Sequence, residues 1–488
     1  MAFTLRGDDV CRITHPTPIP NPHWVAFSPS AANLIGIELN DQGYPVDAAW
    51  LDLLAGNSLE LNSIQFNQPI STVYSGHQFG VWAGQLGDGR AILLGEIQNQ
   101  ELQLKGSGMT HYSRMGDGRA VLRSSIREFL CSEAMYGLGI PTTRALSVVG
   151  SHLPVRRETM ETAAVCARLA PSFLRIGHFE HYAAQGNLDR LRELADTLIK
   201  QHYRDCSSND EPYLELFKQV CIRNARLVAQ WQAVGFCHGV LNSDNISVLG
   251  LTLDYGPFGF LDHFDIAHIC NHSDQGGRYA YHRQPQIMHW NMACLASSFL
   301  PLMQLNHDEH QSQNLLREAL EIFPTTFAKY WQELFRAKIG LFTSQDGDVQ
   351  LLERLLQAMH DSKVDFSYFF RQLSQIKKSS HPEQIPLRDL FVDRNAIDQW
   401  FKDYLLRLND ESLDDGARKL KMNSINPKYV LRNHLAQSAI EAAKQGDFSE
   451  VQTLLKILST PYEEQPQYHL YSNPPPADLE KIAVSCSS

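Results

Sequence analysis

The chain has few of the features that mark secreted, membrane or nucleic-acid-binding proteins. Its nine cysteines include no C-x-x-C pair, so neither a zinc site nor a disulfide framework is indicated. No run of about 18 apolar residues is present that could cross a membrane, and residues 1–14 lack the apolar core of a secretory signal. Lys and Arg are nowhere concentrated and the formal net charge is −11, which disfavours a nucleic-acid partner. We therefore expect a cytoplasmic protein.

What the chain does have is enough apolar content, over 488 residues, for two or three packed units. The segment from about 62 to 105 reads as strands. Apolar runs at 81–86 and 91–97 flank Gly-Asp-Gly-Arg at 87–90, and Asp-Gly between two such runs predicts a β-hairpin. A third strand is expected over 101–105, ending in a lysine.

The predicted hairpin tip is a candidate phosphate contact. Gly87 and Gly89 lack side chains, so backbone N–H groups could approach phosphates there, while the guanidinium of Arg90 could fork onto them. The alternative is structural, because a tight turn needs its glycines whatever it binds. The spacing also differs from the G-x-G-x-x-G of protein kinases, which leaves the orientation of a nucleotide open.

Lys105 closes a strand that reads as half buried, and the next predicted element is an amphipathic helix that ends near Gly137. In kinases a lysine at this place neutralises nucleotide phosphates and pairs with a glutamate of the following helix. Glu128 is the candidate partner and Glu133 the competing acid. Glu128 lies off the apolar stripe of its helix, so a solvated side chain explains it equally simply.

Arg168 and Arg175 lie in an otherwise apolar segment, and Pro171 between them favours a strand or turn over a continuous helix. Buried arginines need an anion or a carboxylate. A phosphate is one answer and an internal salt bridge is the other.

The most specific pattern is H-G-x-L-x-x-x-N at 238–245, which follows a long predicted helix over about 213–234 stopped by Gly235. Two short strands, 246–249 and 251–253, are expected to bring Asp-Tyr-Gly at 254–256 back beside it. This is the order of the catalytic loop and metal-binding turn of a kinase.

One position of that pattern is changed, because Val240 stands where a kinase has its catalytic Asp. Asn245 and Asp254 remain as hard oxygen ligands, suited to Mg²⁺ or Mn²⁺ bridging phosphates. Asp244 is the remaining carboxylate inside the loop and the candidate proton acceptor, unless it is a surface turn residue. The pattern indicates nucleotide chemistry other than ordinary γ-phosphoryl transfer.

Several runs together resemble the selenoprotein O family, the YdiU-type protein adenylyltransferases. They are S-G-H-Q-F-G at 75–80, L-K-G-S-G at 104–108, G-D-G-R at 116–119, the loop at 238–245, D-Y-G-P-F-G-F at 254–260, N-P-K-Y-V-L-R-N at 426–433 and V-S-C-S-S at 484–488. The resemblance implies an α+β, protein-kinase-like bilobal fold, divided here into residues 1–165, 166–335 and a helical 336–488.

The resemblance also implies an activity. ATP is held in a flipped orientation, with Mg²⁺ or Mn²⁺, and AMP is transferred to Ser, Thr or Tyr hydroxyls of protein substrates, redox-pathway proteins among them; UTP with Mn²⁺ is a further donor. Asp244 is implied as proton acceptor, and Asn245 and Asp254 as metal ligands. The implied nucleotide contacts are Gly87, Gly89, Arg90, Lys105, Asp117, Gly118, Arg168, Arg175 and Asp254.

Cys486 occupies the place where some family members carry selenocysteine, and Cys270 lies where a kinase activation loop would be. A thiol switch between them is a hypothesis. Two other functions compete with adenylyl transfer: a small-molecule phosphotransferase, which would need Asp at position 240, and a non-catalytic nucleotide-binding scaffold, which would not need Lys105, Asn245 and Asp254 together.

Overall fold

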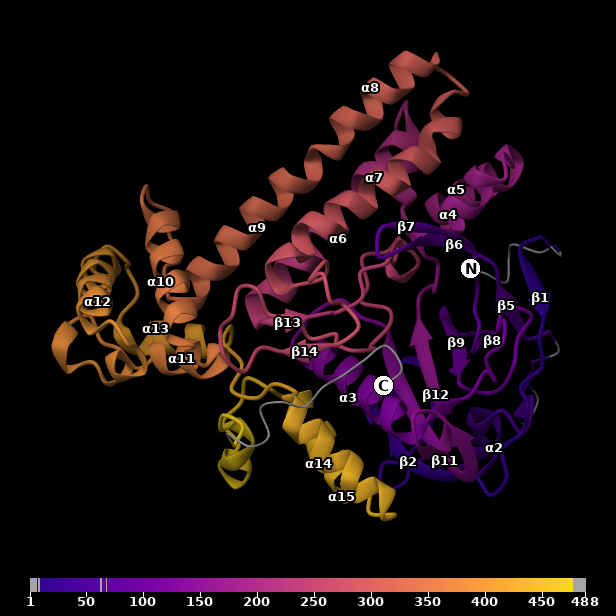
Figure 1. Cartoon of the computed structure of the whole chain (residues 1–488), viewed down its shortest axis with the longest axis horizontal. Coiled ribbons are helices and arrows are strands. Elements are labelled where there is room, and N and C mark those ends of the chain that lie inside the picture. Colours follow the sequence, from indigo (N-terminus) through magenta and orange to yellow (C-terminus); the bar gives the residue numbers. More distant parts are fainter. Residues whose placement is uncertain (1–6, 8, 62–63, 67, 477–488) are drawn as a thin grey trace.

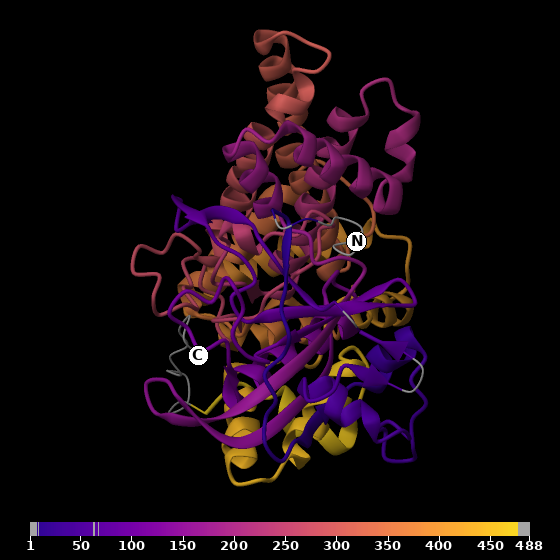
Figure 2. The same cartoon turned by 90° about the vertical axis from the view of Figure 1, so that its right-hand side faces the viewer.

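The computed structural model describes residues 7, 9–61, 64–66 and 68–476. It is an α+β protein: an antiparallel sheet occupies the N-terminal part of the chain, and helices make up most of the rest (Figures 1 and 2). Within the described residues, none of the helices is both long and apolar enough to cross a membrane.

The main sheet has eight strands in the order β1-β5-β8-β9-β12-β11-β2, with β10 paired to β12. Side chains alternate across it, so Leu102 and Leu104 pack on one face with Leu53 and Leu54 of α2 (Ala49–Ala55), while Lys105 points to the other face. Its strands are β1 Cys11–Ile13, β2 His23–Phe27, β5 Ile70–Thr72, β8 Ala91–Ile97, β9 Gln100–Lys105, β10 Ala120–Val121, β11 Arg144–Arg156 and β12 Met160–Ala170.

The predicted hairpin between 81–86 and 91–97 is wrong. β7 (Val81–Gln85) pairs with β6 (Ser75–Gln78), whereas β8 pairs with β5 and β9. The loop between β7 and β8 is held instead by Asp88, whose buried carboxylate accepts hydrogen bonds from the backbone N and Oγ1 of Thr72. The tight turn lies one step earlier in the chain, at Phe79 and Gly80, which both have positive φ, 51° and 82°.

The helix predicted after Lys105 is α3 (Leu122–Gly137), which packs against β11 and β12 (Figure 1). Gly137 is its last residue, but it does not have the left-handed conformation of a helix-ending glycine. A Cβ at Gly137 would lie 2.1 Å from the carbonyl oxygen of Leu458. The missing side chain therefore serves the close approach of α15 (Ser449–Ser459) to α3.

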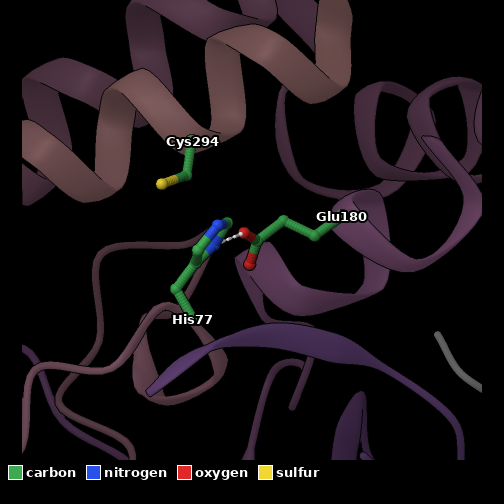
Figure 3. Close-up of side chains that lie close together, drawn as sticks. All are labelled: His77, Glu180 and Cys294. Atoms are coloured by element: carbon green, nitrogen blue, oxygen red, sulfur yellow. Dashed lines mark hydrogen bonds and ion pairs between the residues drawn. The ribbon is translucent and has the colours of Figure 1, made fainter. Parts of the chain in front are cut away.

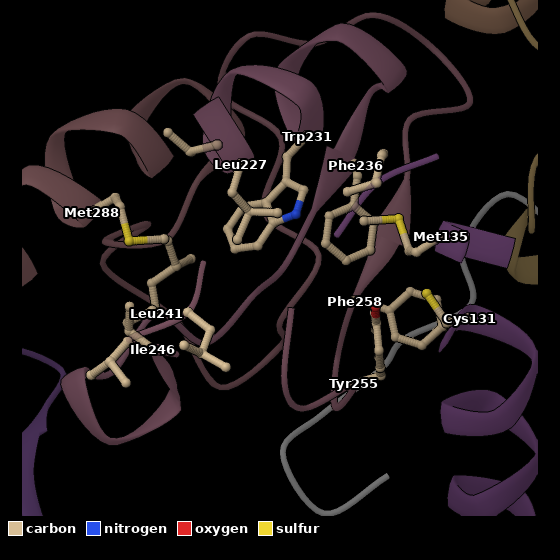
Figure 4. Packing of buried hydrophobic residues seen from close by; sticks show 14 of the residues in the cluster. Cys131, Met135, Leu227, Trp231, Phe236, Leu241, Ile246, Tyr255, Phe258 and Met288 are labelled. Atoms are coloured by element: carbon tan, nitrogen blue, oxygen red, sulfur yellow. The ribbon is translucent and has the colours of Figure 1, made fainter. Parts of the chain in front are cut away.

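The helices that follow form a second layer around α6 (Pro212–Val234), which ends at the left-handed Gly235 as predicted. Trp231, Phe236, Tyr255 and Phe258 fill the core between this layer and α3 (Figure 4). The other helices are α1 Pro29–Ala32, α2 Ala49–Ala55, α4 Ile176–Ala184, α5 Leu188–His202, α7 Gln284–Met303, α8 Glu309–Leu320, α9 Ile322–Lys338, α10 Asp348–Ser362, α11 Phe366–Leu373, α12 Arg394–Asn409, α13 Asp415–Asn423 and α14 Asn433–Lys444.

The segment between Asn245 and Asp254 was expected to form two short strands. It forms a turn closed by one β-bridge, between Ile246 and Thr252, and its other backbone groups bond to neighbouring segments. The strands that pair near the predicted catalytic loop are β13 (Phe236–Cys237), which comes directly before it, and β14 (Gly259–Phe260), which follows Asp254. The remaining strands form two-stranded antiparallel sheets. In one, β3 (Glu60–Leu61) pairs with β4 (Ile64–Gln65), and in the other β6 pairs with β7.

Residues 336–476 contribute to two different cores. Side chains of α10, α11 and α12, such as Phe370 and Trp400, pack in a second cluster together with Phe335 of α9. Helices α14 and α15 return to the sheet side of the molecule and pack on α3 (Figure 1). The chain end described by the structure thus braces the helix that carries Glu128.

Candidate active site

A cavity of about 880 Å³ lies between the sheet and the helical layer. Sequence positions from 74 to 257 contribute to its walls. Its lining includes every candidate nucleotide, metal and base residue: Gly87, Gly89, Arg90, Lys105, Asp117, Gly118, Glu128, Arg168, Arg175, Asp244, Asn245 and Asp254.

Lys105 is the last residue of β9, and its Nζ lies 2.7 Å from Oε2 of Glu128 on α3. The glutamate is 4% exposed, so the solvated alternative does not hold. The competing acid, Glu133, is engaged elsewhere: its carboxylate binds Arg144 at 2.7 Å and the hydroxyl of Ser28 at 2.5 Å. The ion pair of the cavity is therefore that of Lys105 and Glu128.

Asp254 is surrounded by cations. Its Oδ1 lies 3.1 Å from Nζ of Lys105 and 2.7 Å from Nη1 of Arg168, and its Oδ2 lies 2.6 Å from Nη1 of Arg175. Burial alone would raise the pKa of Asp254, but Arg175, Lys105 and Arg168 outweigh it and hold the pKa well below its usual range. Arg168 also binds Glu128 at 2.8 Å. Three cations thus share two carboxylates, and the surplus positive charge faces the cavity.

Asp244 lies in a short 3₁₀ turn, Ser243–Asn245, and is buried rather than a surface turn residue. Its Oδ2 accepts a hydrogen bond from Gln78 Nε2 at 3.4 Å, whereas its buried Oδ1 has no hydrogen-bond partner among the residues that the structure describes. Burial raises the pKa of Asp244 to about 6, against the opposing effect of Arg175. A carboxylate in the cavity wall that still has hydrogen-bonding capacity can accept a proton.

Asn245 is oriented by its amide nitrogen, which donates to the carbonyl oxygen of Val240 at 3.3 Å. This leaves its Oδ1 unused by that bond, and both Asn245 and Asp254 line the cavity. An amide oxygen and a carboxylate are hard oxygen donors. Such a set fits Mg²⁺ or Mn²⁺ and not a thiolate-preferring metal.

The outer wall of the cavity contains the glycines. Gly118 has a φ of 66°, and a Cβ there would overlap the backbone of Gly108. A Cβ at Gly87 would lie 2.4 Å from the ring of Tyr112. Arg90 is exposed beside them, and Asp117 forms an ion pair with Arg157 at 2.8 Å. Close packing thus requires Gly87 and Gly118 whether or not a phosphate is bound.

Sequence reasoning did not predict the cavity-lining residues of the β6–β7 hairpin. Gln78 and Phe79 line the cavity, and the backbone N of His77 donates to Oγ of Ser243 at 2.7 Å. The S-G-H-Q-F-G run at 75–80 was visible, but nothing in its pattern indicated that it would lie on the predicted catalytic loop. Arg119 and Arg157 also line the cavity and were not predicted to do so.

Cys270 is not among the lining residues of the cavity. Its thiol donates to the carbonyl oxygen of Cys237 at 3.4 Å, and burial raises its pKa well above the usual value. Cys486 lies outside the described residues, so the pairing of Cys270 with Cys486 stays a prediction.

The chain as a whole is similar to known proteins. A family model described as protein adenylyltransferase SelO matches residues 4–459. The chain belongs to this family. Proteins named protein nucleotidyltransferase YdiU are similar over nearly their whole length. That of Burkholderia multivorans is 52% identical over 499 residues, covering 100% of this chain and 95% of the relative. That of Cupriavidus metallidurans is 52% identical over 484 residues, covering 97% and 88%.

Proposed function

We propose that this SelO-family chain transfers AMP from ATP to Ser, Thr or Tyr hydroxyls of protein substrates and releases pyrophosphate. One observation carries the proposal: Lys105, Arg168 and Arg175 converge on Asp254 at the inner end of the cavity, while position 240 holds a valine. The cation cluster supports polyphosphate binding. Without a base at position 240, the carboxylate left to accept a proton is Asp244.

The charge distribution favours a triphosphate in reversed orientation. The terminal phosphates carry the most charge, so they are drawn to the inner end, where Lys105, Arg168 and Arg175 leave positive charge uncompensated. Gly87, Gly89, Arg90, Asp117 and Gly118 would then contact the rest of the nucleotide along the outer wall. In this orientation the innermost phosphorus is the one presented to an acceptor.

In the transfer step, the acceptor hydroxyl gives its proton to the carboxylate of Asp244 as its oxygen attacks the α-phosphorus, and the bond to pyrophosphate breaks. Lys105, Arg168 and Arg175 stabilise the charge that grows on the leaving group. Asn245 and Asp254 would hold Mg²⁺ or Mn²⁺, which supplies further charge stabilisation there. With its pKa raised to about 6, Asp244 is ionised at neutral pH and still a useful base.

Four further parts of the proposal depend on the family resemblance and the site together. The sheet and the helical layer correspond to the two lobes of a kinase-like fold, with boundaries near residues 165 and 335. UTP with Mn²⁺ serves as a second donor. The protein acts in the cytoplasm, where redox-pathway proteins are among its substrates. A disulfide between Cys270 and Cys486 regulates it; activity that is indifferent to dithiothreitol would reject this last point.

Labelled ATP tests the activity. The protein is incubated with Mg²⁺ or Mn²⁺ and ATP labelled on the α- or the γ-phosphate, with a cell extract as source of acceptors. We expect protein-bound label from the α position alone, lost on chelation of the metal and in Asp254→Ala. Label from the γ position would indicate a phosphotransferase instead, and label from neither would indicate a scaffold.

A further inference from the structure

A second hollow, of about 590 Å³, lies beside the β6–β7 hairpin at the beginning of α7. We call it the arginine groove. Its lining includes Arg278, Arg283, Gln286, Ile287, His289 and Trp290.

The two arginines of this groove contact aromatic and backbone groups. The guanidinium of Arg278 lies 4.8 Å from the ring centroid of Trp290, and Nη1 of Arg283 donates to the carbonyl oxygens of Gly276 and Gly277, at 3.5 and 3.3 Å. Asp274 is close in sequence, but its carboxylate accepts from the backbone N of Arg278 and of the following tyrosine. Across the described part of the chain, neither arginine forms an ion pair, unlike the arginines at the inner end of the cavity.

The groove and the nucleotide cavity are separated by a single turn of backbone. Phe79 lines the cavity, and a Cβ on the next residue, Gly80, would lie 2.8 Å from Cζ of Arg278. The backbone N of Phe79 donates to Oη of Tyr279 at 2.9 Å, and that hydroxyl donates to Asn242 in the predicted catalytic loop at 2.6 Å. A chain crossing this turn would touch both the groove and the cavity.

The hairpin that forms this divide is firmly held. Nδ1 of His77 lies 2.6 Å from Oε1 of the buried Glu180 on α4, and Cys294 of α7 lies close to both side chains, within 4.8 Å (Figure 3). The ring also makes edge contacts with Trp82 and Trp290, at 5.1 and 5.2 Å. A two-stranded ribbon is weak by itself. Here its base is fixed to two helices.

The outer side of the hairpin is apolar and open. Phe79, Val81 and Trp82 are 41%, 70% and 43% exposed, within four consecutive residues, and Phe79 also lines the cavity. Clustered exposed apolar side chains next to unpaired charges are typical of a surface that binds another protein.

We propose that the arginine groove binds an acidic segment of the acceptor protein, with the hairpin tip contacting the residues between that segment and the hydroxyl to be modified. The inference rests on the proposed function, because it names which acceptors the same site selects. Two unpaired guanidiniums attract carboxylates, although the chain as a whole carries a net charge of −11. Acceptors with Asp or Glu near the hydroxyl are therefore preferred to neutral or basic ones.

Binding of a matched peptide pair tests the groove. One fluorescein-labelled peptide contains a single Tyr flanked by Glu, and the other has Gln at every Glu position. We expect the Glu peptide to bind the full-length protein about ten-fold tighter or more, with affinity falling as salt is added. Arg283→Glu, at an exposed position, should abolish the difference, and Arg283→Gln should reduce it. Arg317→Glu, on the exposed face of α8, is the matched control and should leave it unchanged.

Equal affinity for the two peptides, no measurable binding of the Glu peptide, or equal loss in Arg283→Glu and Arg317→Glu would overturn the inference. Failure of the proposed function looks different. A protein that prefers the Glu peptide but transfers no α-label would refute adenylyl transfer and leave the groove as an acidic docking site. A protein that transfers α-label without preference between the peptides would refute the groove alone. Arg283→Glu should retain Mg²⁺–ATP binding, measured by thermal shift, since Arg283 is outside the nucleotide cavity.

Discussion

Nη1 of Arg175 lies 2.6 Å from Oδ2 of Asp254 and, through the same nitrogen, 2.9 Å from the backbone carbonyl oxygen of Asp244. One guanidinium thus joins the predicted metal-binding carboxylate to the predicted catalytic loop. Arg175 precedes α4 and is buried, so this link is a fixed part of the fold and not a mobile surface contact.

Replacement of Arg175 by Met should lower transfer of α-label by about 100-fold or more, because it removes charge stabilisation and the link between the two loops. Steady-state kinetics with α-labelled ATP measures the loss. Arg123→Met is the matched control, since Arg123 pairs with Glu161 at 2.9 Å away from the cavity lining. Similar losses in both variants would contradict the assignment.

Asp244→Asn should lower kcat by about 100-fold or more while the KM for ATP changes little, because the base acts on the acceptor and not on the nucleotide. The side chain keeps its size, so circular dichroism should be unchanged. Full activity of this variant would remove the role given to Asp244.

Glu128→Gln and Glu133→Gln, five residues apart on α3, should have different effects. The first releases Lys105 and Arg168 from their shared partner and should reduce transfer strongly. The second breaks a buried pair with Arg144 and should cost on the order of 3 kcal/mol of unfolding free energy, with kcat preserved in the folded fraction. Urea denaturation and kinetics on both variants separate the two outcomes.

Lys338, the last residue of α9, is buried beside Phe366 and Phe370, with Nζ 5.1 and 4.3 Å from their ring centroids. Burial lowers its pKa to about 7. Between pH 7 and its unfolded value of 10.5, the unfolded chain binds the proton more tightly, so the free energy of unfolding should rise with pH by up to about 1.4 kcal/mol per unit.

Lys338→Met should remove this contribution. The variant should be more stable than the parent at pH 7, and its advantage should shrink as the pH approaches 10. Denaturant titrations at several pH values measure the difference, and Lys421→Met, on an exposed turn of α13, serves as control. An advantage independent of pH would contradict a neutral buried lysine.

Much of the local structure was readable from the sequence. The strand over 91–97 and the helix over 213–234 with its terminal Gly235 appear within a residue or two of the predicted bounds. The sequence did not predict which strands pair with each other. Asp-Gly at 88–89 has the composition of a hairpin turn, but the carboxylate of Asp88 binds Thr72, so β8 pairs with β5 and not with β7.

For the candidate site, too, the sequence predicted residues but not which of them are in contact. Residue types and spacing indicated Lys105, Glu128, Asp244, Asn245 and Asp254, because phosphate and metal chemistry requires cations, carboxylates and amide oxygens, and the spacing matches that of a kinase. Pattern alone could not choose between Glu128 and Glu133, since both lie on α3 and only burial against Lys105 distinguishes them. Nor could it place Gln78 beside Asp244.

The sequence by itself determined which segments are helix or strand and which residue types stand ready for nucleotide chemistry, because backbone propensity and side-chain chemistry are local. The tertiary structure decided which charges share a cavity, that Arg168 and Arg175 meet Asp254, and that the 75–80 hairpin lies on the loop of Asp244. These pairings join residues 79 to 166 positions apart. They depend on packing of the whole chain, which no local pattern encodes.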